Sequence, residues 1–418
     1  MNRLGDTVAV PGRRLGFVAL RTLPPVRIGP LRRRGPAPEP PRRQPVPEPV
    51  VPPQRDVALD LLRGLAMVVL VTNHIHLLSA LEWLTAPFLS AGETLVAVSG
   101  VVVGMVFGRR WLSHGARPTT FALWRRSFEI YRASVAVVVL VGALTFVPGL
   151  ATEALTMPKA GGTTDLYDFE AGPRLVFAVL ALQAGPWQID VLGFFVAALA
   201  LAPAVLWALA RGWWPSVLAL SWALFIFGRE THLHVLPGQS EAPFALLIWQ
   251  LLFTHGVVVG WYRRRIGARL RHLSRAAIIA VLAVAALSAY VRLHELGFSP
   301  FWLSPEQWHA WDARYFSKRD LDPARLISML SFAAAAYLGL RRFDGIADRL
   351  PGRLLLALGR HSFYVFIVQV FICLAVASVP GLTGAGIGLI GNALVQLGCL
   401  ALLATMIHYR LLFRWIPR

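Results

Sequence analysis

The chain has 418 residues, of which 56% are hydrophobic and 15% are charged, and its formal net charge is +19. Soluble globular proteins carry about 25% charged residues, so this composition excludes an ordinary water-soluble domain. The basic residues lie in short segments between long apolar runs. This arrangement excludes the continuous basic stripe of a nucleic-acid-binding domain and predicts no nucleic-acid partner. The sequence therefore predicts an all-α fold, a polytopic bundle of transmembrane helices.

Residues 1–55 differ from the rest of the chain because they are rich in Pro and Arg. Pro at this density removes backbone donors and blocks helix formation, so we expect a disordered tail. No apolar run in this segment is long enough for a signal peptide. The predicted organisation is a tail at 1–55 followed by a transmembrane domain at 56–418.

Ten apolar segments follow the tail, and most are long enough to cross the ~30 Å hydrocarbon core as a helix. The loops between them alternate between basic and non-basic, which predicts that both termini are cytoplasmic. A shorter apolar segment at 173–184 is predicted to be interfacial or re-entrant. The ten predicted spans are 57–80, 87–107, 130–149, 189–210, 214–228, 244–262, 275–294, 325–341, 354–378 and 386–409.

The first two predicted spans carry ionisable residues, which are costly within a membrane and therefore indicate function. Arg63 and His74 are eleven residues apart, so they share one helix face and lie about 16 Å apart along its axis. Glu93 in the second span reaches nearly the same depth as His74. A carboxylate beside an imidazole orients it and stabilises its charged form. We therefore predict a catalytic set of His74, Glu93 and Arg63.

Further polar residues are candidates for ligand binding. Arg side chains bind phosphate through two parallel hydrogen bonds, so an Arg cluster at the cytoplasmic end is a candidate cofactor-binding site. Ordinary positive-inside charge explains most of this cluster equally well. The candidate cluster consists of Arg109, Arg110, Arg125, Arg126 and Arg132.

Asp190, Gln250 and Ser99 are candidates for substrate binding. Gln250 also fits a role as a hydrogen-bonding link between helices, and Ser99 with Gly100 also fits close helix packing. Cys373 and Cys399 lack the spacing of metal ligands, and no metal site is predicted.

The segment Asp60-Leu-Leu-Arg-Gly-Leu-Ala, followed by Asn73-His74, resembles the Arg-x10-His motif of the acyltransferase-3 membrane acyltransferases. The resemblance is closest to their OpgC-type branch, which is named for succinylation of periplasmic glucans. It extends over residues 55–410 and departs from the branch at Asn73, where Asp is expected, and at His255. Further similar stretches are 91–100, 125–132, 190–192, 249–260, 318–326 and 358–366.

The resemblance implies an enzyme that moves a succinyl or acetyl group from cytoplasmic acyl-CoA to a hydroxyl of an extracytoplasmic envelope glycan or glycolipid. It implies a multi-pass protein of a bacterial plasma membrane, in contact with lipid, with acyl-CoA as co-substrate and no tightly bound cofactor. His74 would be the general base, Glu93 would steady its imidazolium, and Arg63 would bind a phosphate or the free carboxylate of a dicarboxylic acyl group. Direct transfer and a covalent intermediate on His74 or Ser99 are both compatible with these residues.

Two other classes of function remain open at this point. A transporter or flippase for a lipid-linked or acylated sugar would use the same polar face as a pathway, without consuming acyl-CoA. A non-catalytic scaffold would tolerate substitution of Arg63 and His74, and the intramembrane position of these residues argues against it.

Overall fold

The structure is a computed structural model of the chain. It describes residues 56–75, 80–81, 91–156, 167, 169–270, 272, 274–292, 304–342, 345–382 and 387–416. The tail predicted at 1–55 lies outside these residues. Chain contacts separate residues 1–54 from the unit formed by residues 55–418, and only the latter is described below.

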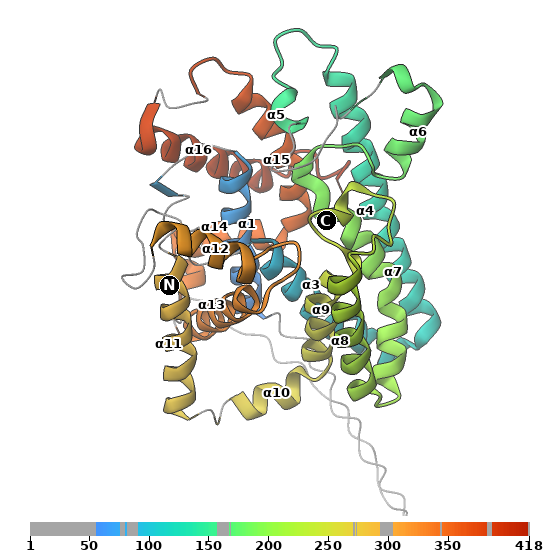
Figure 1. Cartoon of the computed structure of the whole chain (residues 1–418), viewed down its shortest axis with the longest axis vertical. Helices are drawn as coiled ribbons and strands as arrows, with labels where there is room; N and C mark the ends of the chain where they lie inside the picture. The colour runs from blue at the N-terminus through green and yellow to red at the C-terminus, as the bar shows by residue number, and fades with distance from the viewer. Residues whose placement is uncertain are drawn as a thin grey trace, which may run out of the picture. The chain divides into compact units, whose positions relative to one another are not determined.

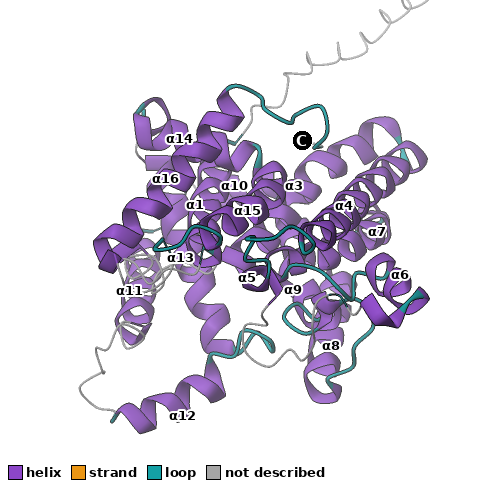
Figure 2. Ribbon diagram, turned by 90° about the horizontal axis from the view of Figure 1, so that it is seen from above, coloured by secondary structure: helices purple, strands orange, loops and turns teal. Residues whose placement is uncertain are grey.

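The described part of residues 55–418 is helical and contains no strand (Figure 2). Figure 1 labels most of its helices in chain order. Its longer helices are α1 (Val57–His74), α3 (Ala91–His114), α4 (Ala116–Leu144), α7 (Asp190–Ala210), α8 (Trp214–Thr231), α9 (Leu246–Trp261), α11 (Arg275–Arg292), α13 (Pro323–Arg342), α15 (Ser362–Ala377) and α16 (Gly388–His408). The shorter ones are α5 (Glu153–Thr156), α6 (Pro173–Leu180), α10 (Arg263–Leu270), α12 (Pro305–Tyr315), α14 (Leu350–Arg360) and the 3-10 turns η1 (Phe169–Ala171), η2 (Trp187–Ile189), η3 (Gln239–Glu241) and η5 (Ile346–Asp348).

A helix overlaps each of the ten predicted spans, but the helices differ in length and hydropathy. Within the described residues, six are long and apolar enough to cross a membrane, or seven if the bent pair α14–α15 counts as one span. Helices α9 and α11 are apolar but shorter. The protein is therefore a helical membrane protein, and the count of ten spans and the cytoplasmic termini stay predictions.

Helix α4 begins much earlier than the predicted span 130–149. Helix α4 begins at Ala116, well before residue 130, because its polar first half is also helical. Arg125 and Arg126 pair with Glu129 at helical spacings of four and three residues, which stabilise a helix outside an apolar run. The short segment predicted at 173–184 forms α6 and ends at Leu180.

The ninth predicted span, 354–378, is not one continuous helix. The chain bends by 94° between α14 and α15 at His361, whose φ of −116° and ψ of 31° leave helical geometry. Gly359, just before the bend, lies so close to α1 that an added Cβ would overlap the carbonyl oxygen of Asp60. The close crossing of α14 with α1 therefore precedes a sharp turn that places α15 beside α1.

Helices α3 and α9 form the most intimate helix pair in the described structure. A Cβ added to Gly100 would overlap the carbonyl oxygen of Phe253, and one added to Gly256 would overlap that of Ala97. Gly104 and Gly260, one turn further along, meet the opposing backbone in the same way. Small residues at four-residue spacing allow this approach, and packing contacts then hold the helices together in a lipid environment.

Candidate functional site

A buried ion pair joins the first turn of α3 to the first turn of α13. Arg325 donates a short hydrogen bond from its Nε to Oε1 of Glu93, and the Glu93 side chain is completely buried. A second Arg325 nitrogen donates to the carbonyl oxygen of Phe316 at 3.2 Å. A buried carboxylate is stable only when such a partner compensates its lost hydration. Glu93 is therefore held at a fixed position at the beginning of α3.

Lys318 lies in the loop between α12 and α13 and interacts with both Glu93 and Asp190. Its Nζ lies 4.7 Å from the centre of the Phe244 ring, a cation–π contact. The side chain reaches solvent, but the surrounding protein lowers the pKa of its ammonium group, while Glu93 and Asp190 act in the opposite direction. Two cations and two carboxylates therefore meet where α3, α7 and α13 begin.

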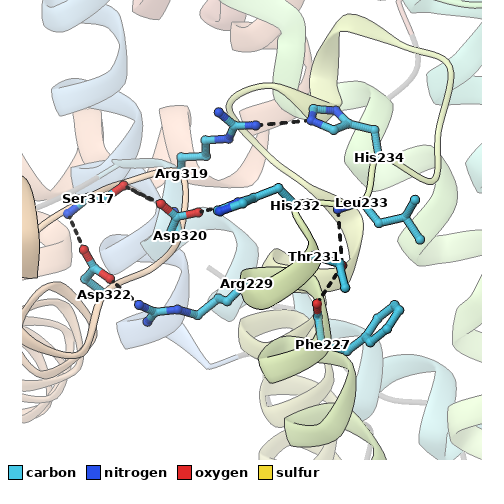
Figure 3. Close-up of polar contacts among 10 residues, drawn as sticks. All are labelled: Phe227, Arg229, Thr231, His232, Leu233, His234, Ser317, Arg319, Asp320 and Asp322. Atoms are coloured by element: carbon cyan, nitrogen blue, oxygen red, sulfur yellow. Dashed lines mark hydrogen bonds and ion pairs between the residues drawn. The ribbon is translucent and has the colours of Figure 1, made fainter.

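Hydrogen bonds hold the loop around Lys318 in place (Figure 3). Within the loop, Asp322 accepts a hydrogen bond from the backbone N–H of Ser317 at 3.0 Å. Asp322 also pairs with Arg229 of α8 at 2.7 Å. The residues that flank Lys318 also contact the segment after α8. The contacts are Arg319 with His234 at 3.2 Å and Asp320 with His232 at 3.8 Å. Because its neighbours are anchored, Lys318 is presented to Glu93 and Asp190 by a fixed backbone.

His74 is the last residue of α1 and is half-buried. Its ring packs edge-on against the ring of Trp187 in η2, with 4.8 Å between centroids. The carbonyl oxygen of His74 accepts a hydrogen bond from the Cys373 thiol at 3.5 Å. Since η2 leads directly into Asp190 and α7, His74 lies at the same end of the bundle as the charged cluster of Glu93, Asp190, Lys318 and Arg325. The pairing of His74 with Glu93 stays a prediction, because the partner that the contacts identify for Glu93 is Arg325.

Arg63 lies in the second turn of α1, half-buried, and donates a hydrogen bond of 2.6 Å from Nη2 to Oγ of Ser362, the first residue of α15. Around it, Asp60 pairs with Arg360 at 3.5 Å, and Asp56 accepts from the Tyr337 hydroxyl at 3.2 Å. The spacing of about 16 Å along α1 separates this end from His74. Both ends of the predicted Arg63–His74 face therefore contact α15.

The predicted phosphate-binding arginines lie on α3 and α4 and are mostly exposed. Arg126 is half-buried, bonds Glu129 at 3.1 Å and lies over the Phe363 ring at 5.1 Å, next to the residue that bonds Arg63. The Arg132 side chain is exposed on α4. The exposed members of the cluster are Arg109, Arg110, Arg125 and Arg132.

The three residues proposed to bind substrate occupy different environments. Asp190 begins α7 and interacts with Lys318. Gln250 accepts from the Ser221 hydroxyl at 2.9 Å and donates to the Ser221 carbonyl at 2.8 Å, so its amide links α9 to α8. Ser99 is half-buried on α3, next to the close contact at Gly100. The structure thus brings Asp190 to the cluster, whereas Gln250 has the helix-linking contacts that were its alternative role.

Lys318 and Arg325 are the site residues to which the sequence alone assigned no role. One signal was available, because Lys318 is one of only two lysines in a chain whose other basic residues are all Arg. Lys is able to lose its proton near neutral pH when buried, whereas Arg stays charged. Among the described residues, no group of three His, Cys, Asp or Glu side chains is arranged to hold a metal ion.

The helical membrane fold and the charged cluster around Glu93 and Lys318 define a membrane protein with a polar site at one end of its bundle. Residues 55–415 match the family model described as OpgC protein. The match covers most of the chain, so the chain belongs to the OpgC family, and this membership indicates a role in glucan modification by acyl transfer. Comparisons with curated proteins and with solved structures give no match.

Proposed function

We propose that this protein is a membrane O-acyltransferase that moves a succinyl or acetyl group from acyl-CoA to a hydroxyl of an extracytoplasmic envelope glycan or glycolipid. The observation that carries the proposal is the distribution of polar residues along α1 in a member of the OpgC family. Arg63 lies in the second turn of α1, and His74 is its last residue, packed against Trp187 just before Asp190. Asp190 and Glu93 both interact with Lys318.

The two ends suit two different substrates. Arg63 and the nearby arginines of α3 and α4 have the chemistry to bind the phosphates of CoA. Arg63 is about 16 Å from His74 along the helix, too far to hold the carboxylate of a succinyl group whose thioester is at His74. At the His74 end, Lys318 is the accessible cation, so it is the better candidate for that carboxylate.

The reaction requires a base and a stabiliser for negative charge. His74 would take the proton of the acceptor hydroxyl as its oxygen attacks the thioester carbonyl. The carbon–sulfur bond then breaks, an ester forms, and the proton passes to the departing CoA thiolate. With an acetyl donor, which has no free carboxylate, Lys318 is instead a candidate to stabilise the oxyanion of the intermediate, because its ammonium group lies beside Glu93 and Asp190. Asp190 would accept hydrogen bonds from hydroxyls of the acceptor.

The test is the release of CoA by purified protein in liposomes, with succinyl-CoA or acetyl-CoA as donor and envelope glycan as acceptor. We expect wild type to release CoA and form an acylated glycan, and His74→Ala to lose at least 100-fold in rate. His408→Ala is the matched control, since His408 is exposed at the end of α16. Movement of glycan across the membrane without any CoA release would contradict acyl transfer and indicate a transporter.

A further inference from the structure

The seam between α1 and α15 is held at two points that have the same spacing on both helices. Arg63 bonds Ser362 at 2.6 Å, and His74 accepts from Cys373 at 3.5 Å. Eleven residues separate the two contacts on α1 and eleven separate them on α15, so the helices run side by side in the same direction. The polar ends of the predicted catalytic face are therefore also the two ends of this seam.

Gln369 lies on α15 between these two contacts. It follows Ser362 by seven residues and precedes Cys373 by four, so it lies within about 40° of both on the helix face that contacts α1. It is about 10 Å beyond Ser362 and about 6 Å before Cys373 along the axis. Along the seam, Gln369 therefore lies at a height between those of Arg63 and His74.

The amide of Gln369 is completely buried, and neither its nitrogen nor its oxygen has a hydrogen-bond partner in the described structure. Buried amides are nearly always bonded, and leaving one without partners costs free energy. Gln396 of α16 is equally buried but donates to the carbonyl oxygen of Thr72 at 3.1 Å. Burial in this bundle therefore does not by itself leave a glutamine unbonded.

We propose that Gln369 binds the amide-bearing arm of a thioester donor that lies along the seam between α1 and α15. This inference rests on the proposed acyl transfer and adds the place of the donor. The pantetheine arm of CoA is a linear chain with two amides between its phosphates and its thioester. Each amide has one N–H and one carbonyl oxygen, which complement the oxygen and nitrogen of the Gln369 side chain. With phosphates at Arg63, the thioester points toward His74.

The first test compares two donors of equal chain length. S-acyl N-acetylcysteamine carries an amide near its sulfur, and the S-pentyl thioester has the same number of chain atoms without an amide. We expect wild type to prefer the amide donor roughly tenfold in kcat/KM, as two neutral hydrogen bonds would give. Gln369→Met should lower this preference to about one. A Gln369→Met variant that keeps the wild-type preference, or loses activity equally on both donors, would overturn the inference.

The second test requires no turnover. Gln369→Met should raise Tm without ligand because it removes a buried amide that has no partner, and free pantetheine should raise the Tm of wild type only. Gln396→Met is the control, with a lowered Tm and an unchanged response to pantetheine. Equal stabilisation of wild type and Gln369→Met by pantetheine would contradict the inference. If wild type turned over no thioester, the proposed function would fail, and the response to pantetheine would still decide whether Gln369 binds an amide.

Discussion

Two helix seams in this bundle are built in opposite ways. The α3–α9 seam is closed by Gly100, Gly104, Gly256 and Gly260, which bring the two backbones into direct contact. The α1–α15 seam is joined by polar contacts at its two ends and carries the unbonded amide of Gln369 between them. At the first seam the two backbones touch, whereas the second contains a buried amide, that of Gln369, without a hydrogen-bond partner in the described structure. The α3–α9 seam is therefore a packing contact, whereas the α1–α15 seam is the one along which we expect the donor to lie.

Substitution of Glu93, at the beginning of α3, should have the largest effect on stability. Glu93→Ala removes the carboxylate that compensates the mostly buried charge of Arg325, so we expect a loss of about 3–5 kcal/mol of stability. Thermal unfolding in detergent measures this loss. The double variant Glu93→Leu/Arg325→Met should recover most of the stability and none of the activity. A double variant as unstable as Glu93→Ala would show that the ion pair does not explain the loss.

Adding a methyl group at the α3–α9 seam, where the two backbones touch, should have the next largest effect on stability. Gly260→Ala would force its Cβ into the carbonyl oxygen of Val101, and we expect about 1–3 kcal/mol of destabilisation. Gly398→Ala on α16 is the control because no atom lies within 4 Å of an added Cβ there. Equal melting temperatures for the two variants would mean that the seam is looser than its geometry indicates.

A bonded glutamine outside the α1–α15 seam should behave differently from Gln369. Gln250→Leu removes the bonds to Ser221 and leaves the carbonyl oxygen of Ser221 without this donor, so we expect about 1 kcal/mol of lost stability. The melting temperature of the purified variant gives the answer. A raised Tm would remove the distinction that the comparison draws between bonded and unbonded amides.

The smallest expected effect is a shift in pH dependence at Lys318. The surrounding protein lowers the pKa of its ammonium group, so the charge is present at low pH and is lost as pH rises through a value below that of an ordinary lysine. If transfer needs this charge, its rate falls on the alkaline side. Lys318→Arg stays charged and should carry the alkaline limb to higher pH in a pH–rate profile. Superimposable alkaline limbs would exclude Lys318 as the group responsible.

The sequence predicted the features that depend on local pattern. Apolar runs located a helix at all ten positions, and helical periodicity placed Arg63 and His74 on one face. The ion pair of Glu93 with Arg325 joins residues 232 positions apart, and no local pattern indicates which of many arginines pairs with a given carboxylate. The bend at His361 was missed for a similar reason, because it depends on the crossing of Gly359 with α1. Lys318 was the one missed residue that its rarity in the chain could have identified.

The most direct test places the acyl donor and the glycan acceptor on opposite sides of a membrane. Proteoliposomes would contain envelope glycan in the lumen and receive acyl-CoA, radiolabelled in its acyl group, on the outside. Because the donor is expected at Arg63 and the acceptor at His74, the account predicts labelled glycan in the lumen with wild type and none with His74→Ala. Label on glycan only when donor and acceptor share one compartment would contradict transfer between opposite ends of α1.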